Sequence, residues 1–243
     1  NSINWARCMT QSVYFFWAYL KLREKNKDLI FSVPSGNFGH AYAGWTAKQM
    51  GLPIKKLLIA TNSNDVLHKL FSENNYEKSS VDQTLAPSMD ISVASNFERL
   101  LYNLHDNNPD VLSSIMAQFP EKPISIPKEK WDLVVKFFSS DRCSDQEIKE
   151  QIKSTYEESG YLLDPHTATG VRASNNLESK DELVVTMATA HPAKFGEAIG
   201  GAIPGHNLDI PKRLNIVFDK EESYEVLSED YEEVKQFILS NVN

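Results

Sequence analysis

The sequence predicts an α/β protein whose parallel, twisted sheet carries helices on both faces. Two observations support this prediction. Strand-like and helix-like segments alternate over residues 29–74, and each strand-like run is almost continuously apolar, as in strands that are buried on both faces. A glycine-bounded turn also follows the first of these runs, at the carboxyl end of a strand, where ligands bind in such sheets.

The first part of the chain supplies the elements of this sheet in order. They are a helix over 5–25, a strand over 29–33, a helix over 39–50 that ends at Gly51 and Pro53, a strand over 56–61, and a helix over 66–74 capped by Asn64 or Asp65. The apolar residues of the first helix spread over more than one face: Trp5, Met9, Val13, Phe16, Trp17 and Leu20. We therefore expect this helix to be buried on both sides, beneath the sheet.

The middle of the chain is richer in charge and poorer in strand signals. Helices are predicted over 96–104, 110–118, 128–139 and 144–158, which together form a helical excursion at about 96–158. The chain then returns to the sheet pattern. A turn at Asp164-Pro165 opens a helix that runs through Val171, a strand covers 182–187, and a last helix covers 229–239 with its packing face at Tyr231, Val234, Phe237 and Ile238.

Composition limits the classes of partner. The 243 residues carry a net charge of −8, which argues against nucleic acid or an anionic membrane as the main partner. No apolar run reaches the roughly 18 residues that a membrane-spanning helix needs. Cys8 and Cys143 lack disulfide-framework or metal-ligand spacing and are expected to be free thiols, so we predict no metal site. A cytoplasmic location is the default expectation.

The turn Ser35-Gly36-Asn37-Phe38-Gly39 is a candidate anion site. Its glycines allow close approach of the backbone, and the amides at the start of the following helix favour a bound anion. The same pattern also fits a simple strand-to-helix bend. The turn by itself therefore leaves both interpretations open.

Five motifs in order resemble the threonine synthase family, and together they extend over essentially the whole chain. They are residues 1–7 (NSINWAR), 33–39 (VPSGNFG), 60–65 (ATNSND), 87–92 (PSMDIS) and 188–195 (ATAHPAKF). The resemblance implies a fold type II enzyme, similar to the tryptophan synthase β chain, that uses pyridoxal 5′-phosphate (PLP). The implied reaction converts O-phospho-L-homoserine and water to L-threonine and phosphate, the last step of threonine biosynthesis. It is a carbon–oxygen lyase reaction.

The resemblance also implies a cofactor site. Backbone amides of Gly36, Asn37, Phe38 and Gly39 would hold the PLP phosphate, with Ser35 as a hydroxyl donor. Thr189 matches the position that faces the pyridine nitrogen, where a neutral hydroxyl is expected to leave that nitrogen largely unprotonated. The alternative for Thr189 is a simple cap on the next helix.

Asn4 and Arg7 are the candidates for the substrate phosphate. They lie three residues apart on one face at the start of the first helix, and an arginine can bind phosphate through two parallel N–H bonds. The alternative for Arg7 is a solvated or ion-paired side chain. His166, His191 and Asp90 are candidates for residues that support the site, although each could also serve only a local turn.

One expected residue is missing. The Schiff-base lysine of the family lies in a Phe-Lys-Asp motif upstream of the Asn-Ser-Ile-Asn stretch, and no Phe-Lys-Asp occurs in this sequence. His40 also stands where bacterial members often have Asp. Because the chain begins with Asn rather than Met, we expect it to be the later, C-terminal part of a longer catalytic region and to be inactive alone.

Three alternatives stay open at this point. The first is a threonine synthase-like phospho-lyase acting on O-phosphohomoserine. The second is a non-catalytic homologue that lost the lysine, and the third is an unrelated phosphate-binding module. The sequence does not address the oligomeric state.

Overall fold

The computed structural model describes residues 4–25, 27–119, 121–178, 181–218 and 220–242, and the chain divides after Asn207 into two compact units. The second unit contains α10 (Lys212–Phe218) and α11 (Tyr231–Asn241). Val234 and Phe237 of α11 are half-buried, and no residue of this helix is fully buried. Cys8 and Cys143 are both buried and neither forms a disulfide. None of the described helices has the length and apolar character needed to cross a bilayer.

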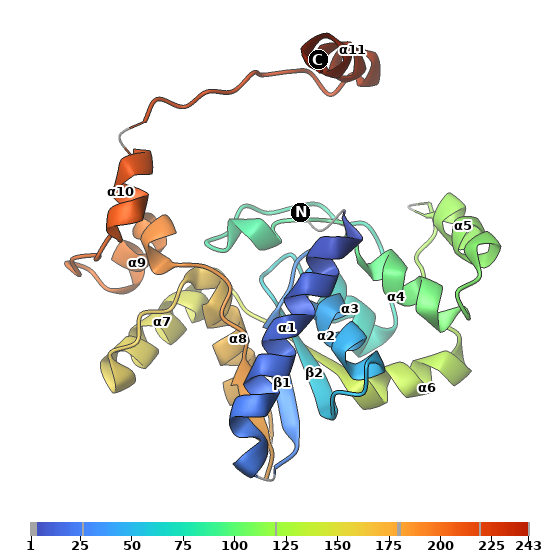
Figure 1. The fold of residues 1–243 in the computed structure, drawn as a ribbon, viewed down its shortest axis with the longest axis horizontal. Coiled ribbons are helices and arrows are strands. Elements are labelled where there is room, and N and C mark those ends of the chain that lie inside the picture. The colour runs from blue at the N-terminus through green and yellow to red at the C-terminus, as the bar shows by residue number, and fades with distance from the viewer. Residues whose placement is uncertain (1–3, 26, 120, 179–180, 219, 243) are drawn as a thin grey trace. The chain divides into compact units, whose positions relative to one another are not determined.

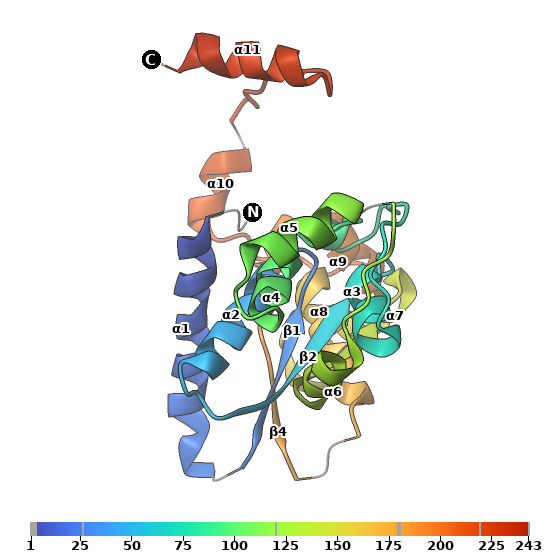
Figure 2. The ribbon, with the colours of Figure 1, turned by 90° about the vertical axis from the view of Figure 1, so that its right-hand side faces the viewer.

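The first unit is built on a sheet of four parallel strands in the order β3-β2-β1-β4 (Figures 1 and 2). The strands are β1 (Leu29–Pro34), β2 (Ile54–Thr61), β3 (Phe138–Arg142) and β4 (Leu183–Thr186). The predicted parallel α/β fold is therefore confirmed. Because β2 and β4 flank β1 on opposite sides, the direction of winding reverses beside β1, and ligands bind at such a reversal.

Helices cover both faces of this sheet (Figure 2). The α-helices described in this unit are α1 (Trp5–Leu22), followed by a 3-10 turn over Arg23–Lys25, α2 (Gly39–Gln49), α3 (Val66–Glu73), α4 (Phe97–Leu104), α5 (Pro109–Gln118), α6 (Lys128–Phe137), α7 (Asp145–Ser159), α8 (Pro165–Asn176) and α9 (Gly196–Ala202). Successive strand residues alternate between two cores. Phe31 and Leu57 pack on the side of α1 and α2, whereas Ile30 and Leu58 pack with Ala173 of α8.

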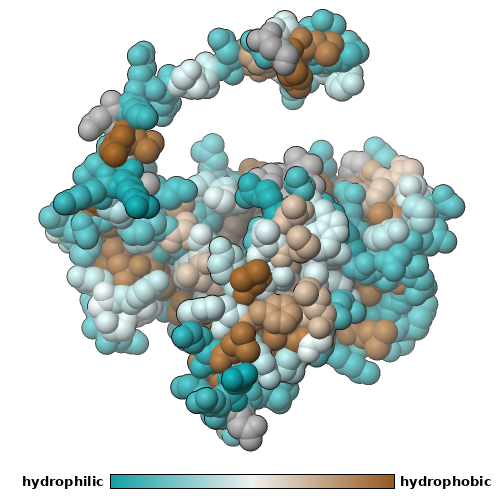
Figure 3. Space-filling view, viewed as in Figure 1, coloured by the Kyte–Doolittle hydropathy of each residue, from teal (hydrophilic) through white to brown (hydrophobic). Residues whose placement is uncertain are grey.

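Only one face of α1 is buried, so the expected burial on both sides is wrong. Cys8, Ser12 and Phe15 face inward, and the Phe15 ring lies 5.0 Å from that of Phe31. The remaining large apolar residues, except the half-buried Phe16, form a stripe that is 46% to 63% exposed: Trp5, Met9, Val13, Trp17 and Leu20. This α1 stripe contributes to the apolar surface over α1 in Figure 3. The sequence pattern revealed the apolar residues but not whether anything covers them.

Two local predictions also differ from the structure. The helix predicted over 128–139 ends at Phe137, and Phe138–Arg142 forms β3, which pairs with β2 inside the predicted helical excursion. Asp65 precedes α3 without capping it through its side chain. Its carboxylate instead binds Lys69 Nζ at 3.1 Å and Arg142 at 2.9 Å, an ion-paired arrangement that ties α3 to β3.

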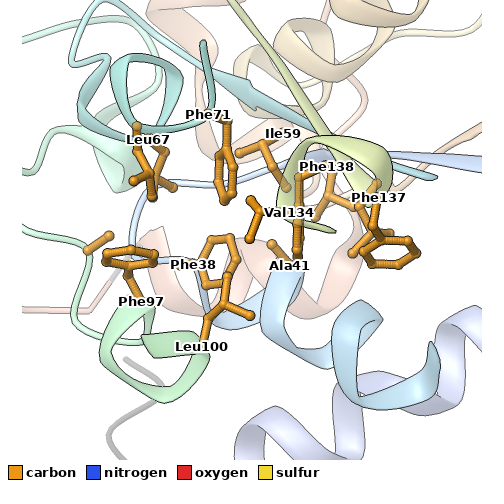
Figure 4. Packing of buried hydrophobic residues seen from close by; sticks show 14 of the residues in the cluster. Phe38, Ala41, Ile59, Leu67, Phe71, Phe97, Leu100, Val134, Phe137 and Phe138 are labelled. Carbon is orange, nitrogen blue, oxygen red and sulfur yellow. The ribbon is translucent and has the colours of Figure 1, made fainter. Parts of the chain in front are cut away.

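Phe38, in the turn after β1, has a left-handed backbone with φ of 65°, which is costly for a bulky residue. Its side chain is fully buried. The ring packs against three others, with centroids 5.8 Å from Phe71, 6.1 Å from Phe97 and 6.0 Å from Phe138 (Figure 4). This aromatic cluster holds the strained turn and places the start of α2 directly after it.

Replacement of this ring provides a test of the cluster. We expect Phe38→Ala to lower the free energy of unfolding by about 3–5 kcal/mol, because it leaves a cavity among three aromatic rings. All four tryptophans lie in the first unit, so their fluorescence during urea unfolding reports its stability. Leu133→Ala is the control, since Leu133 is 63% exposed on α6 and should change stability by no more than about 0.5 kcal/mol. Equal stabilities of the two variants would contradict the role given to Phe38.

Candidate functional site

A cavity of about 670 Å³ lies beyond the carboxyl ends of β1 and β4. It is located where the winding of the sheet reverses. Its walls come from α1, the turn after β1, the loop at 88–89, α8 and the segment after β4. The lining residues are Arg7, Gln11, Tyr14, Trp17, Ala18, Pro34, Ser35, Gly36, Asn37, His40, Ser88, Met89, His166, Val185, Thr186, Met187, Ala188 and Thr189.

The turn after β1 offers hydrogen-bond donors to this cavity. Ser35 is 4% exposed, and its Oγ is buried with no hydrogen-bond partner. Asn37 Oδ1 accepts the Gly39 amide at 2.9 Å, so that amide is already engaged. The next amides, of His40 and Ala41, lie in the first turn of α2, where no helix carbonyl reaches them. The turn therefore combines an unpaired buried hydroxyl with a helix N-terminus, an arrangement suited to an anion.

Gly36 is required because the backbone of a 3-10 turn, Pro87–Met89, lies against it. A Cβ at position 36 would be 2.8 Å from Met89 Cα and 3.2 Å from Ser88 O. Asp90, the residue after this turn, anchors it through side-chain hydrogen bonds. Its Oδ1 accepts hydrogen bonds from Asn62 and Asn64 at 2.7 and 2.9 Å. Asp90 does not line the cavity, so it acts in the turn rather than in the site.

His166 lines the cavity and is 4% exposed. Its Nε2 accepts the Ser88 amide at 3.1 Å, and its Nδ1 lies 3.1 Å from Asp164 Oδ1. This pattern assigns a neutral ring with its hydrogen on Nδ1. Because both nitrogens are occupied, His166 connects α8 to the 3-10 turn. His191 is outside the cavity, and its Nδ1 accepts the Ala193 amide at 3.2 Å as a local cap.

Thr189 follows β4 and lines the cavity. It does not cap the next helical turn, because His191 occupies that position. Its Oγ1 lies 3.2 Å from Thr167 Oγ1 and 3.4 Å from Asp164 Oδ1. Sequence reasoning missed Asp164 and Thr167 as part of the site, since Asp164 was recognised only in the turn that opens the helix.

Asp164 is buried at the start of α8 and accepts the amides of His166 and Thr167 as the helix cap. Burial would raise the pKa of its carboxyl, but the hydrogen bonds from His166 and Thr167 outweigh burial and lower that pKa. Gly170 permits this helix to approach the strands, because a Cβ there would be 2.9 Å from both Pro34 Cγ and Thr186 Cγ2. Close packing of α8 thus brings Asp164 to the strand ends.

The structure separates the two residues predicted to share a phosphate. Arg7 lines the cavity with an exposed side chain on α1. Asn4 is exposed and does not line the cavity. Its Oδ1 accepts the Ala6 amide at 2.9 Å as the N-cap of α1. Gln11 and Tyr14, which the sequence reasoning did not single out, follow Arg7 along the cavity wall at helical spacing.

His40 is a further residue that sequence reasoning left without a role. Part of its surface lines the cavity, but Nε2 is buried with no hydrogen-bond partner. Its ring lies 5.4 Å from the Phe15 ring at an edge-on angle. Burial lowers the pKa of His40 from 6.5 to about 4, so the imidazole is neutral at physiological pH.

This burial gives a pH-dependent stability. The unfolded chain protonates His40 near pH 6.5 and the folded chain only near pH 4, so stability should fall as the pH drops through this window. The expected loss is on the order of 3 kcal/mol, measured by urea unfolding at a series of pH values. We expect His40→Gln to flatten this slope. His206→Gln, outside the cavity, should retain it, and parallel slopes for wild type and His40→Gln would contradict the assignment.

Several known proteins are similar to this chain in sequence and in fold. A family model described as "Threonine synthase, C-terminal" matches residues 167–238. Threonine synthase of Pseudomonas aeruginosa is 43% identical over the whole chain and 52% of its own length, and that of Saccharomyces cerevisiae is 42% identical over 84% of the chain and 44% of its own length. The crystal structure of PLP-bound threonine synthase from Brucella melitensis is 40% identical, with a TM-score of 0.87 over 98% of this chain and 51% of that one. The chain thus spans about half the length of these relatives.

Proposed function

Because the chain belongs to the threonine synthase family, with the fold of the PLP-dependent type II enzymes, we propose that it forms the C-terminal part of a PLP-dependent threonine synthase. The proposed reaction converts O-phospho-L-homoserine and water to L-threonine and phosphate. One observation carries the proposal: four of the five family-like motifs contribute residues to one cavity, represented by Arg7, Ser35, Met89 and Thr189. The remaining motif, residues 60–65, supplies Asn62 and Asn64, which bind Asp90 next to the 3-10 turn that lines the cavity.

The residues around the turn fit the phosphate of PLP. Ser35 offers an unpartnered buried hydroxyl, and the first turn of α2 offers amides and the positive end of a helix dipole. Gly36 lets the backbone of Ser88 and Met89 pack against the turn, which a Cβ would prevent. When bound, PLP supplies the electron sink for the chemistry at the substrate carbons. The part of this chain would be to hold the phosphate, and Thr189 would meet the ring at the opposite wall.

Arg7 is the proposed contact for the phosphate of the substrate. It is the cationic side chain among the described cavity-lining residues, apart from the histidines, and it lies on the wall formed by α1. A guanidinium can bind phosphate through two parallel hydrogen bonds. Asn4 would act indirectly, because its cap on the Ala6 amide fixes the first turn of α1 from which Arg7 extends.

We assign no catalytic residue to these 243 residues, since the Phe-Lys-Asp motif of the Schiff-base lysine does not occur in them. In the proposed enzyme this lysine lies on a preceding segment of the catalytic region. The exposed α1 stripe supports this proposal, because a surface of five large apolar residues favours a covering partner. Trp17 of this stripe also lines the cavity, so such a partner would lie next to the α1 wall.

The phosphate site can be tested with PLP itself. Gly36→Ala should weaken PLP binding on the order of tenfold or more, because its Cβ would displace the turn or Met89. Binding is measured by the change in cofactor fluorescence during titration of the chain. Gly200→Ala is the matched control, since a Cβ at that position meets nothing within 4 Å and should leave affinity unchanged. Equal affinities of the two variants would contradict the proposed cradle.

The activity can be tested by supplying the proposed missing part. We expect the chain alone to form no threonine from O-phospho-L-homoserine, and to form threonine and phosphate in equal amounts when produced with a lysine-bearing segment of a relative. Lysine replacement by alanine in that segment should abolish the gain. Threonine formation by the chain alone would contradict the assignment of the lysine, and release of phosphate with a keto acid would indicate the phospho-lyase instead.

A further inference from the structure

Asn96, at the start of α4, is a buried polar residue whose side chain reaches the turn after β1. We propose that Asn96 is a positioning residue, which fixes the Asn37 carbonyl and thereby turns the Phe38 amide toward an anion in the cavity. The proposal rests on the proposed function in one respect, namely that this turn binds the phosphate of a pyridoxal compound.

The Asn96 side chain does not have the usual role of its position. Asn96 is the N-cap of α4, where an asparagine side chain normally accepts an amide of the first helical turn, but it makes no such bond. Asn108 occupies the same position in α5 and does accept the amides of Asp110 and Val111, at 3.0 and 3.2 Å. Asn96 is only 1% exposed, so its side chain is committed to partners other than the backbone of its own helix.

These partners define which way the side-chain amide of Asn96 faces. Arg99 Nε, which can only donate, lies 3.0 Å from Oδ1, and the Cys8 thiol of α1 donates to the same oxygen at 3.5 Å. The Asn37 carbonyl, which can only accept, lies 3.2 Å from Nδ2. The oxygen and the nitrogen are thus assigned by their partners, and an asparagine satisfies both sides at once.

The Asn37 carbonyl receives two hydrogen bonds from Asn96, one from the backbone amide at 3.0 Å and one from Nδ2. In a trans peptide the carbonyl and the following N–H group point in opposite directions, so Asn96 directs the Phe38 amide away from α4. None of the described residues accepts a hydrogen bond from the Phe38 amide. Asn37 and His40, on either side of it, line the cavity. The Phe38 amide is therefore available to a ligand there.

The same two hydrogen bonds strengthen the Phe38 amide as a donor. A peptide whose oxygen accepts hydrogen bonds is polarised, which makes its N–H group a better donor. On the apolar side, the rings of Phe38 and Phe97 meet edge to face with centroids 6.1 Å apart (Figure 4). Polar and apolar contacts at the start of α4 thus fix the same peptide of the turn.

Two variants remove the side-chain donor to the Asn37 carbonyl. Asn96→Ser is neutral and is still a good N-cap residue. Asn96→Asp conserves the shape and the acceptor for Arg99, so it retains the packing if the smaller serine fails to fold, but it presents an oxygen to the Asn37 carbonyl. Asn108→Ser is the matched control, because Asn108 caps α5.

The probe is pyridoxine 5′-phosphate, which lacks an aldehyde and so cannot react with lysine side chains. Its ³¹P signal reports binding. The protein is labelled with ¹³C at the asparagine carbonyl carbons and with ¹⁵N at phenylalanine, which selects phenylalanine amides that follow an asparagine. The sequence contains two such pairs, Asn37-Phe38 and Asn96-Phe97.

The two selected amide signals separate the turn from α4. The Phe97 amide already donates to the Ala94 carbonyl at 2.9 Å and serves as an internal reference. Its signal disappears when Asn96 is replaced, which identifies the signal of Phe38. In the wild-type chain we expect the Phe38 signal to move downfield as the probe saturates the site, while the Phe97 signal stays nearly fixed.

Both Asn96 variants should bind the probe roughly three- to tenfold more weakly than the wild type, the range expected for the loss of one hydrogen bond. The shift of the Phe38 amide at saturation should be smaller in both. Asn108→Ser should match the wild type in affinity and in this shift. Urea unfolding of each variant shows how far its stability has changed.

The outcomes separate this proposal from the proposed function. The positioning role is overturned, while the cofactor site stands, if the ³¹P signal reports binding but the Phe38 amide does not move in the wild type. It is also overturned if the Asn96 variants keep the wild-type Phe38 shift at saturation, whatever their stability, or if only Asn96→Asp loses affinity, since charge would then be the cause. If the ³¹P signal stays that of the free probe in the wild-type chain, the cofactor site is overturned and this proposal falls with it.

Discussion

The strained backbone at Phe38 is the constraint on which the rest of the site depends. A left-handed conformation at a bulky residue persists only where its surroundings fix it, and here the ring is fixed among Phe71, Phe97 and Phe138. The same residue ends the turn and begins α2, so core packing on one side sets where the helix amides lie on the other. The hydrophobic core thereby positions the polar wall of the cavity.

A second set of contacts holds the turn after β1 at Gly36, on the side away from the Phe38 ring. The backbone of Met89 lies against Gly36, and the Ser88 amide is bound by His166, which is in turn bound by Asp164. These contacts join the loop after β1 to the start of α8, where Asp164 also accepts the Ala190 amide from the segment after β4 at 3.3 Å. The winding of the sheet reverses between β1 and β4. One buried carboxylate therefore caps α8, fixes the tautomer of His166 and orders the Thr189 wall. Changes at Asp164 should affect all three features together.

The sequence could predict the elements whose local signals and tertiary roles agree. β1 and β2 contain continuous apolar runs, α2 is followed by the stop signals Gly51 and Pro53, and the turn between β1 and α2 was predicted where the structure has it. β3 was missed because its polar residues after Phe138 give no strand signal, and only pairing with β2 defines it. Asp164 was missed as part of the site because a capping residue has the same local pattern whether or not its second oxygen serves a site. The role predicted for Asn4 stays a prediction, and in the structure its side chain caps α1 and does not line the cavity.

The two faces of α1 connect these observations to the chemistry of the cavity. Arg7, Gln11 and Tyr14 of α1 line the cavity wall, and the exposed α1 stripe adjoins this wall at Trp17, which lines the cavity too. An exposed guanidinium attracts an anion weakly, because water screens the charge, and the attraction grows several-fold when the surroundings are drier. A partner that covered the α1 stripe would bury the wall that holds Arg7. Association at an apolar surface would then strengthen an electrostatic contact at the cavity, so the affinity of Arg7 for a phosphate should depend on what covers the helix.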